Sequence, residues 1–110
     1  MNELLTQIGN RIYERRKQLR LTQEELAEKA DISTQTISTA ELGKKALRPE
    51  NIVKICIALE ISTDYLLLGK VTETDHSLLS DKVSNLNSVQ YHHLEDIINS
   101  FLAAIQKKEA

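Results

Sequence analysis

Two short helical patterns in close succession constrain this chain more than any other feature. They occupy the stretch from Thr22 to Leu42, which reads TQEELAEKADISTQTISTAEL. The hydroxyl of Thr22 can cap a helix, and Glu25 stands three residues later, where it completes the pattern of a capping box. Ser33 is a second candidate N-cap. The spacing therefore predicts two short helices joined by a tight turn.

The second of these helices has an apolar back and a polar front. Ile37 and Ala40 share the side that would face a core. The opposite side carries hydroxyl and amide groups, from Thr34, Gln35, Ser38 and Thr39. Side chains of this kind form hydrogen bonds with a partner, and the edges of DNA bases are one such partner.

Apolar spacing and turn residues predict three further helices before residue 70. A roughly helical stripe predicts the first from about Leu4 to Arg20. Gly43 is a natural terminator for the third helix, and Pro49 suits the first turn of the fourth. Ser62 would cap a short fifth helix. No stretch keeps a strand period for long, so the predicted fold class is all-α.

The residues after Gly69 predict a helical tail. Residues 70–74 are polar and aperiodic, which indicates a linker between a domain at 1–69 and a tail at 75–110. The tail should form two helices, and the second carries an apolar seam, composed of Leu94, Ile98, Phe101 and Ile105 with Leu102 beside them. Two short helices cannot bury such a seam alone. We expect it to dock on another chain, and docking on its own first domain is the alternative.

Composition excludes several classes of protein. The formal net charge of −2 argues against a polycation that coats nucleic acid. No run of about 18 apolar residues predicts a membrane span, and the first residues lack the apolar core of a signal peptide. The single cysteine, Cys56, lies in an apolar run and is expected to be a buried core thiol. These features together predict a cytoplasmic protein.

The sequence offers little for catalysis. Its three histidines include the neighbours His92 and His93, which would point about 100° apart on a helix and so could not readily share one metal. There is no Gly-rich phosphate loop and no convincing pair of nucleophile and base. We therefore predict no enzyme activity, no metal site and no cofactor.

From Ile8 to Gly69 the chain resembles the helix-turn-helix domain of the Xre and Cro/lambdoid-repressor family of bacterial and phage transcription regulators. The matching residues are Leu21-Thr22-Gln23-Glu24-Glu25-Leu26-Ala27, Ile32-Ser33, Thr36-Ile37-Ser38, Glu41, Gly43-Lys44, Pro49, Ala58-Leu59 and Asp64-Tyr65-Leu66-Leu67. The resemblance implies a five-helix DNA-binding domain whose third helix enters the major groove of double-stranded DNA.

The resemblance also implies roles for individual residues. By the family's pattern, bases are contacted by Thr34, Gln35, Thr36 and Thr39, and Ser38 shares their outward face. Gln35 ranks first, because one amide can donate to and accept from adenine at once. Phosphate contacts are expected from Gln23, Arg11, Lys44, Lys45 and Arg48. Arg16 and Glu41 match a charged pair that the family buries, so their expected role is structural.

One departure from the family concerns the loop after the third helix. Ala40 stands where many relatives have a larger aliphatic residue, and Ala46-Leu47-Arg48 lengthens the loop that leads to Pro49. We expect Leu47 to fold inward into the space that Ala40 leaves.

The sequence therefore predicts a sequence-specific DNA-binding regulator, a repressor, that acts as a homodimer on a near-palindromic operator. In this reading the tail supplies the dimer interface. The alternative is an antitoxin-type interaction protein whose tail binds a protein partner and whose DNA binding is autoregulatory.

Overall fold

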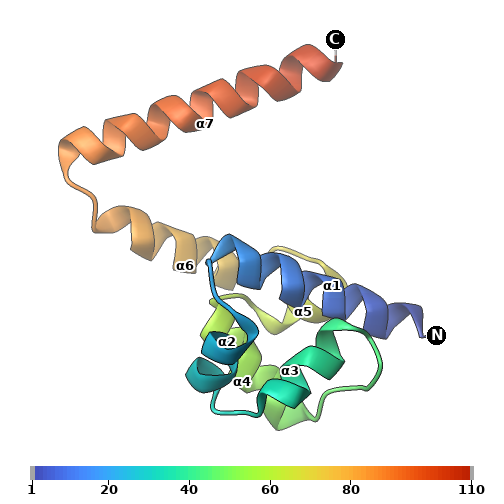
Figure 1. Cartoon of the computed structure of the whole chain (residues 1–110). Coiled ribbons are helices and arrows are strands. Elements are labelled where there is room, and N and C mark those ends of the chain that lie inside the picture. The colour runs from blue at the N-terminus through green and yellow to red at the C-terminus, as the bar shows by residue number, and fades with distance from the viewer. Residues whose placement is uncertain (1, 110) are drawn as a thin grey trace. The chain divides into compact units, whose positions relative to one another are not determined.

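The prediction of an all-α fold is confirmed. The structure, a computed structural model, describes the backbone of residues 2–109 and the side chains of residues 2–106. Over this range it has seven helices and no strand: α1 Glu3–Gln18, α2 Gln23–Ala30, α3 Thr34–Glu41, α4 Pro49–Leu59, α5 Thr63–Leu68, α6 Glu73–Ser84 and α7 Ser88–Glu109 (Figure 1). The chain divides into two compact units between Leu78 and Leu79.

The first unit is built around one apolar core to which each of α1–α5 contributes. Its largest fully buried side chains are Ile12, Leu26, Ile37, Ile55, Leu59 and Leu66. Within this unit α3 packs against both α1 and α2, which covers its inner face and leaves the outer face in solvent. Cys56 is 4% exposed, as expected of a core thiol, and its burial raises the pKa to about 11.

The helix ends follow the local signals in the sequence. The Thr22 hydroxyl accepts a 3.0 Å hydrogen bond from the Glu25 N–H, and the Glu25 carboxylate accepts a 2.9 Å bond from the Thr22 N–H. The Ser33 hydroxyl accepts from the N–H of Thr36 at 3.0 Å, which caps α3. Gly43 ends α3 with a φ of +69°, a conformation that glycine adopts without steric cost.

Two boundaries differ from the predictions. α1 ends at Gln18 instead of near Arg20, because Arg20 adopts the left-handed conformation with a φ of 60°. α6 begins at Glu73, inside residues 70–74, which the sequence had suggested as a linker.

Asp75, in the first turn of α6, ties that helix to the start of α5. Its Oδ1 accepts from the Ser62 N–H at 2.8 Å, and its Oδ2 accepts from the Ser62 hydroxyl at 2.7 Å. Oδ2 also accepts from the N–H and the hydroxyl of Thr72, at 2.8 and 3.1 Å. Burial opposes ionisation of Asp75, but the hydrogen bonds from Ser62 and Thr72 outweigh it and lower the pKa. The spacing from Thr72 to Asp75 is the capping signal that could have predicted this contact.

We expect the Asp75→Asn variant to lose about 1–3 kcal/mol of stability at neutral pH, because the amide cannot satisfy all four donors. The folded-state pKa of Asp75 lies below its ordinary value of 3.8. The contribution of Asp75 to the free energy of unfolding is therefore complete above about pH 4. It disappears as the pH falls through the lower pKa that Asp75 has in the folded state. Urea unfolding of both proteins between pH 7 and pH 2 measures this. Asp81→Asn, an exposed carboxylate later in α6, is the control. If the free energies of unfolding of the wild type and of Asp75→Asn differ by the same amount from pH 7 down to pH 2, Asp75 does not have the lowered pKa assigned to it.

The second unit contains the end of α6 and all of α7. Asn87 and Gln90 cap α7 reciprocally: the Asn87 N–H donates to Gln90 Oε1 at 3.0 Å, and the Gln90 N–H donates to Asn87 Oδ1 at 2.9 Å. Large apolar side chains of α7 remain exposed in the single chain. In the part of the chain that the structure describes, no helix is both long enough and apolar enough to cross a membrane.

Candidate nucleic-acid interface

The turn between α2 and α3 fixes the angle of the helix pair. Asp31 ends α2 in the left-handed conformation, with a φ of 57°. The N–H of Ile32 then donates to the carbonyl of Ala27 at 3.0 Å, and the Ile32 side chain packs against the core. Ser33 follows at once as the N-cap of α3. The turn is therefore held by backbone hydrogen bonds on one side and by apolar burial on the other.

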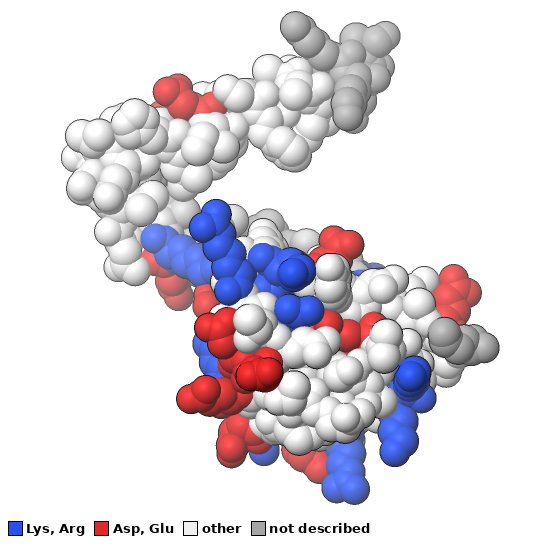
Figure 2. Space-filling view, in the orientation of Figure 1, with Lys and Arg blue, Asp and Glu red and all other residues white. Residues whose placement is uncertain are grey.

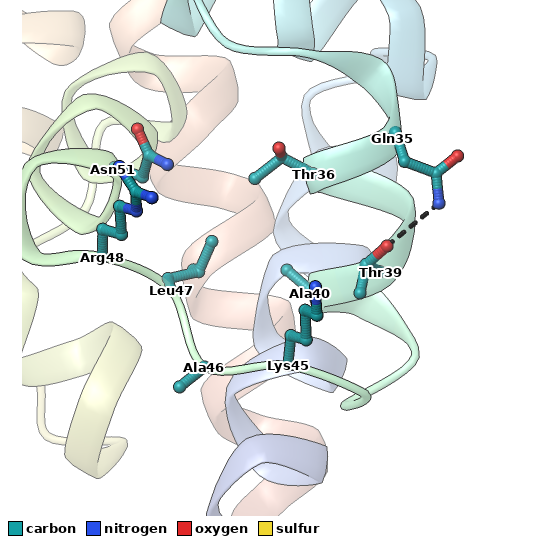
Figure 3. Close-up of a pocket in the computed structure, with 9 residues that line it drawn as sticks. All are labelled: Gln35, Thr36, Thr39, Ala40, Lys45, Ala46, Leu47, Arg48 and Asn51. Atoms are coloured by element: carbon teal, nitrogen blue, oxygen red, sulfur yellow. Dashed lines mark hydrogen bonds between the residues drawn. The ribbon is translucent and has the colours of Figure 1, made fainter.

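The outer face of α3 is polar and uncharged. Thr34 and Gln35 are exposed, and Ser38 and Thr39 are half-buried. The Gln35 amide nitrogen donates to the Thr39 hydroxyl at 3.1 Å, so the two side chains form one hydrogen-bonded pair on this face (Figure 3). One amide hydrogen and the amide oxygen of Gln35 remain available to a partner. This face can donate and accept hydrogen bonds but carries no ionic charge.

Thr36 differs from its neighbours on α3. It is half-buried, and its hydroxyl lies 2.7 Å from the Ser33 hydroxyl at the helix cap. This contact occupies part of its hydrogen-bonding capacity. The side chain of Thr36 points toward the loop that follows α3 (Figure 3).

A pocket of about 230 Å³ lies between α3 and this loop. It is lined by Gln35, Thr36, Thr39, Ala40, Lys45, Ala46, Leu47, Arg48 and Asn51. Leu47 is half-buried and packs against the core, so the expectation that it folds inward is confirmed. The expectation that Leu47 fills the space beside Ala40 is wrong, because a pocket remains that both residues line (Figure 3). Asn51, near the start of α4, is a lining residue that the sequence reading did not single out.

Exposed cations flank α3 on one side. Lys44, Lys45 and Arg48 are all exposed in the loop between α3 and α4. Figure 2 shows basic side chains projecting from this loop at the lower right, beside a largely uncharged surface over α3. Acidic side chains gather over α2 at the lower left. Around α3 the electrostatic attraction for a polyanion therefore comes from this loop, and Figure 2 shows a further group of basic side chains over α1.

Two arginines of α1 are used inside the domain. Arg11 Nη1 donates to the carbonyl of Leu66 at 3.1 Å, and Arg15 Nε donates to the carbonyl of Leu59 at 2.9 Å. Each therefore neutralises the partly negative carbonyl end of another helix. The Arg11 guanidinium also lies so close to Gly69 that a Cβ there would be 2.8 Å from Nη2. Arg11 therefore uses part of its hydrogen-bonding capacity inside the domain, and the phosphate contact predicted for it stays a prediction.

A buried polar network joins α1, α2 and α3. Arg16 Nε lies 2.7 Å from Glu41 Oε2, and Arg16 Nη2 lies 3.0 Å from Glu41 Oε1. The two side chains are only 7% and 5% exposed. The hydrogen bond to Glu41 raises the pKa of Arg16, although burial opposes the shift. Arg16 Nη1 also donates to the carbonyl of Leu21 at 2.8 Å.

Gln23, the first residue of α2, belongs to the same network. Its amide nitrogen donates to Glu41 Oε1 at 3.0 Å, and the residue is half-buried. A second amide hydrogen remains for the phosphate contact predicted from the sequence. Exposed Glu24 and Glu25 stand in the same helical turn and weaken the attraction for an anion there.

Gly9 allows α1 to approach the end of α3. A Cβ at this position would lie 2.4 Å from the carbonyl oxygen of Ala40 and 2.6 Å from that of Glu41. Both contacts are with backbone, which cannot move aside as a flexible side chain can. The lack of a side chain at Gly9 therefore brings Arg16 of α1 within reach of Glu41. A glycine within a helical pattern was the signal for this close approach.

The apolar seam predicted for the tail lies along α7, where its side chains form one stripe. Ile98, Phe101, Leu102 and Ile105 are 47%, 63%, 49% and 36% exposed, and Leu94 is half-buried. Within the second unit these side chains are therefore exposed or only partly covered.

Comparison with known proteins gives the family. The Helix-turn-helix family model matches residues 12–66, half of the chain. Repressor protein C2 of Salmonella phage P22 is 35% identical over 68 residues, which are 62% of this chain but only 32% of that repressor. The cryptic phage CTXphi transcriptional repressor RstR of Vibrio cholerae is 30% identical over 97 residues, 86% of this chain and 87% of that protein.

A solved structure agrees with these relatives. The P22 c2 repressor in complex with synthetic operator 9T has a TM-score of 0.56 and 36% identity, and the match covers 57% of this chain and 96% of that one. The capped pair of helices α2 and α3, the polar outer face of α3 and these matches all indicate the same family. The chain belongs to the Xre-like helix-turn-helix family of DNA-binding transcription regulators, which is not a family of enzymes.

Proposed function

We propose that this protein is a transcriptional repressor that binds a near-palindromic operator as a homodimer. The observation that carries the proposal is the outer face of α3, where Thr34, Gln35 and Thr39 present donors and acceptors beside the cationic loop. Base edges in the major groove offer matching acceptors and donors, and phosphates match the cations. The DNA-bound P22 repressor and the repressor RstR, both similar to this chain, support the same function.

Each group of residues has a proposed role at the DNA. Direct readout belongs to Thr34, Gln35, Ser38 and Thr39, with Thr36 at the inner edge of the same face. Phosphate contact belongs to Lys44, Lys45 and Arg48, and Gln23 contributes where α2 begins. The target being DNA, the protein would act in the cytoplasm of a bacterial cell.

The homodimer is proposed from the apolar stripe of α7. Its side chains recur at helical spacing and are exposed in the single chain, which is costly unless another helix covers them. A symmetric pair of chains would place two copies of α3 about 34 Å apart, one helical turn of DNA. Doubling the domain also supplies affinity that an uncharged reading face lacks.

Selection of bound DNA from a random pool tests the function directly. We expect the full-length protein to enrich one near-palindromic sequence with half-sites about 10 base pairs apart. Enrichment of a single unrepeated site would contradict the symmetric dimer, and no enrichment at all would contradict sequence-specific binding.

The Gln35→Ala variant should weaken binding to the selected operator by about 1–3 kcal/mol and relax the preference at one base pair, because a bidentate amide contact is lost. Competition binding with operators changed at single positions measures both effects. Lys45→Ala is the matched contrast. It should weaken binding to all sequences alike and lower the slope of log affinity against log salt by roughly one. An unchanged base preference in Gln35→Ala would refute the readout assignment.

A further inference from the structure

The pocket beside α3 combines three kinds of surface. Its apolar part comes from Ala40 and Leu47, at the junction of helix and loop. Gln35, Thr36 and Thr39 supply amide and hydroxyl groups on the side of α3. The opposite side carries the cations of the loop and one amide from α4, namely Lys45, Arg48 and Asn51 (Figure 3).

Two residues of this chain create the pocket. Ala40 is buried and small, so α3 presents little bulk toward the loop. Leu47 reaches inward and packs on the core but stays half-exposed, which leaves an apolar wall open to whatever approaches α3. An apolar wall of this kind within a polar face is a place where a methyl group is favoured and a water molecule is not.

The expected occupant follows from the chemistry of DNA. In the major groove, thymine alone among the four bases presents a methyl group, next to an oxygen that accepts hydrogen bonds. Its sugar carries a phosphate that cations bind. Cytosine, with no methyl group, would leave the wall uncovered. The three surfaces of the pocket thus match one thymidine nucleotide.

On the basis of the proposed function, we propose that this pocket receives the methyl group of one operator thymine in each half-site. Leu47 is then a specificity residue, although it lies in the loop and not on α3. Lys45 and Arg48 hold the phosphate backbone at the rim, and the hydroxyl of Thr39 or the amide of Gln35 meets the edge of the base.

Replacement of thymine by uracil tests the proposal, because it removes the methyl group and nothing else. The probe is the duplex selected by the full-length protein, with each thymine pair of the two half-sites replaced in turn by deoxyuridine. One replacement should lower the affinity of the wild-type protein by about fourfold per half-site, the effect of burying one methyl group. In Leu47→Ala the same replacement should change the affinity very little. In Leu47→Met most of the fourfold loss should remain.

Val53→Ala is the matched control, since Val53 is a half-exposed aliphatic residue of α4 that does not line the pocket. It should retain the full uracil effect. The proposal is overturned if no deoxyuridine changes wild-type affinity, or if Leu47→Ala keeps the wild-type loss. Even if Leu47→Ala does not fold, a uracil scan of the wild-type protein without any loss of affinity overturns the proposal. Failure to select any DNA sequence would instead reject the proposed function, so the two failures are distinct.

Discussion

Replacement of Glu41 by alanine should lower the free energy of unfolding by about 3–5 kcal/mol, because it leaves the buried guanidinium of Arg16 without its carboxylate. Arginine keeps its proton in proteins, so this side chain cannot escape the cost by becoming neutral. Gln23 loses its acceptor at the same time. Urea-induced unfolding followed by circular dichroism measures the change. For a domain of this size, such a loss is a large part of the total stability.

Two control variants distinguish the cost of leaving Arg16 unpaired from the net contribution of the Arg16–Glu41 pair to stability. Glu14→Ala removes an exposed carboxylate from α1 and should change stability by less than about 0.5 kcal/mol. The double variant Arg16→Met with Glu41→Leu removes both charges and should recover much of the loss, since apolar replacement of a buried pair is often neutral. If Glu41→Ala were as stable as Glu14→Ala, the pair would have no structural role.

If α7 forms the proposed homodimer interface, the Phe101→Asp variant should be monomeric and should bind a two-half-site operator about 10²- to 10⁴-fold more weakly than the wild type. The charge would lie in the seam of α7, where it could not be covered by a second copy without a large desolvation cost. The affinity falls because the two DNA-binding domains are no longer joined. Binding of one domain to its half-site then no longer holds a second domain close to the other half-site. Sedimentation equilibrium gives the mass, and titration of the selected operator gives the affinity.

Asn99→Asp is the matched control, because it adds the same charge to the same helix about 130° away from the seam. It should remain dimeric and bind DNA as the wild type does. A dimeric Phe101→Asp protein would show that the seam is not the interface. A wild-type protein that is monomeric alone and pairs only with a different chain would favour the antitoxin-type alternative for the tail.

Local chemistry explains why the helix pair could be predicted from the sequence. Thr22, Glu25 and Ser33 each bond a residue three positions away, so their caps depend on nothing distant. The inward positions of Ile37 and Ala40 follow from helical spacing alone. The family resemblance added the ion pair of Arg16 with Glu41, which spacing could not have indicated.

What the sequence did not predict depends on contacts between distant segments. Arg11 has the same charge as Lys45, but tertiary packing brings it to the carbonyl of Leu66, 55 residues away, while Lys45 stays in solvent. Asp75 was assigned to the tail, although it bonds Ser62 in the core. The pocket requires the loop conformation around Leu47, and composition cannot specify that conformation.

Within the eight residues of α3, the side chains that hold the helix in the domain differ from those that face outward. Ile37, Ala40 and Glu41 are buried and hold the helix in the domain, whereas Thr34 and Gln35 are exposed. Substitutions on the outer face should therefore cost little stability while they change the DNA that is recognised. Descendants of one ancestral gene could thus acquire separate targets by single exposed substitutions, and several such regulators could operate in one cell without cross-talk.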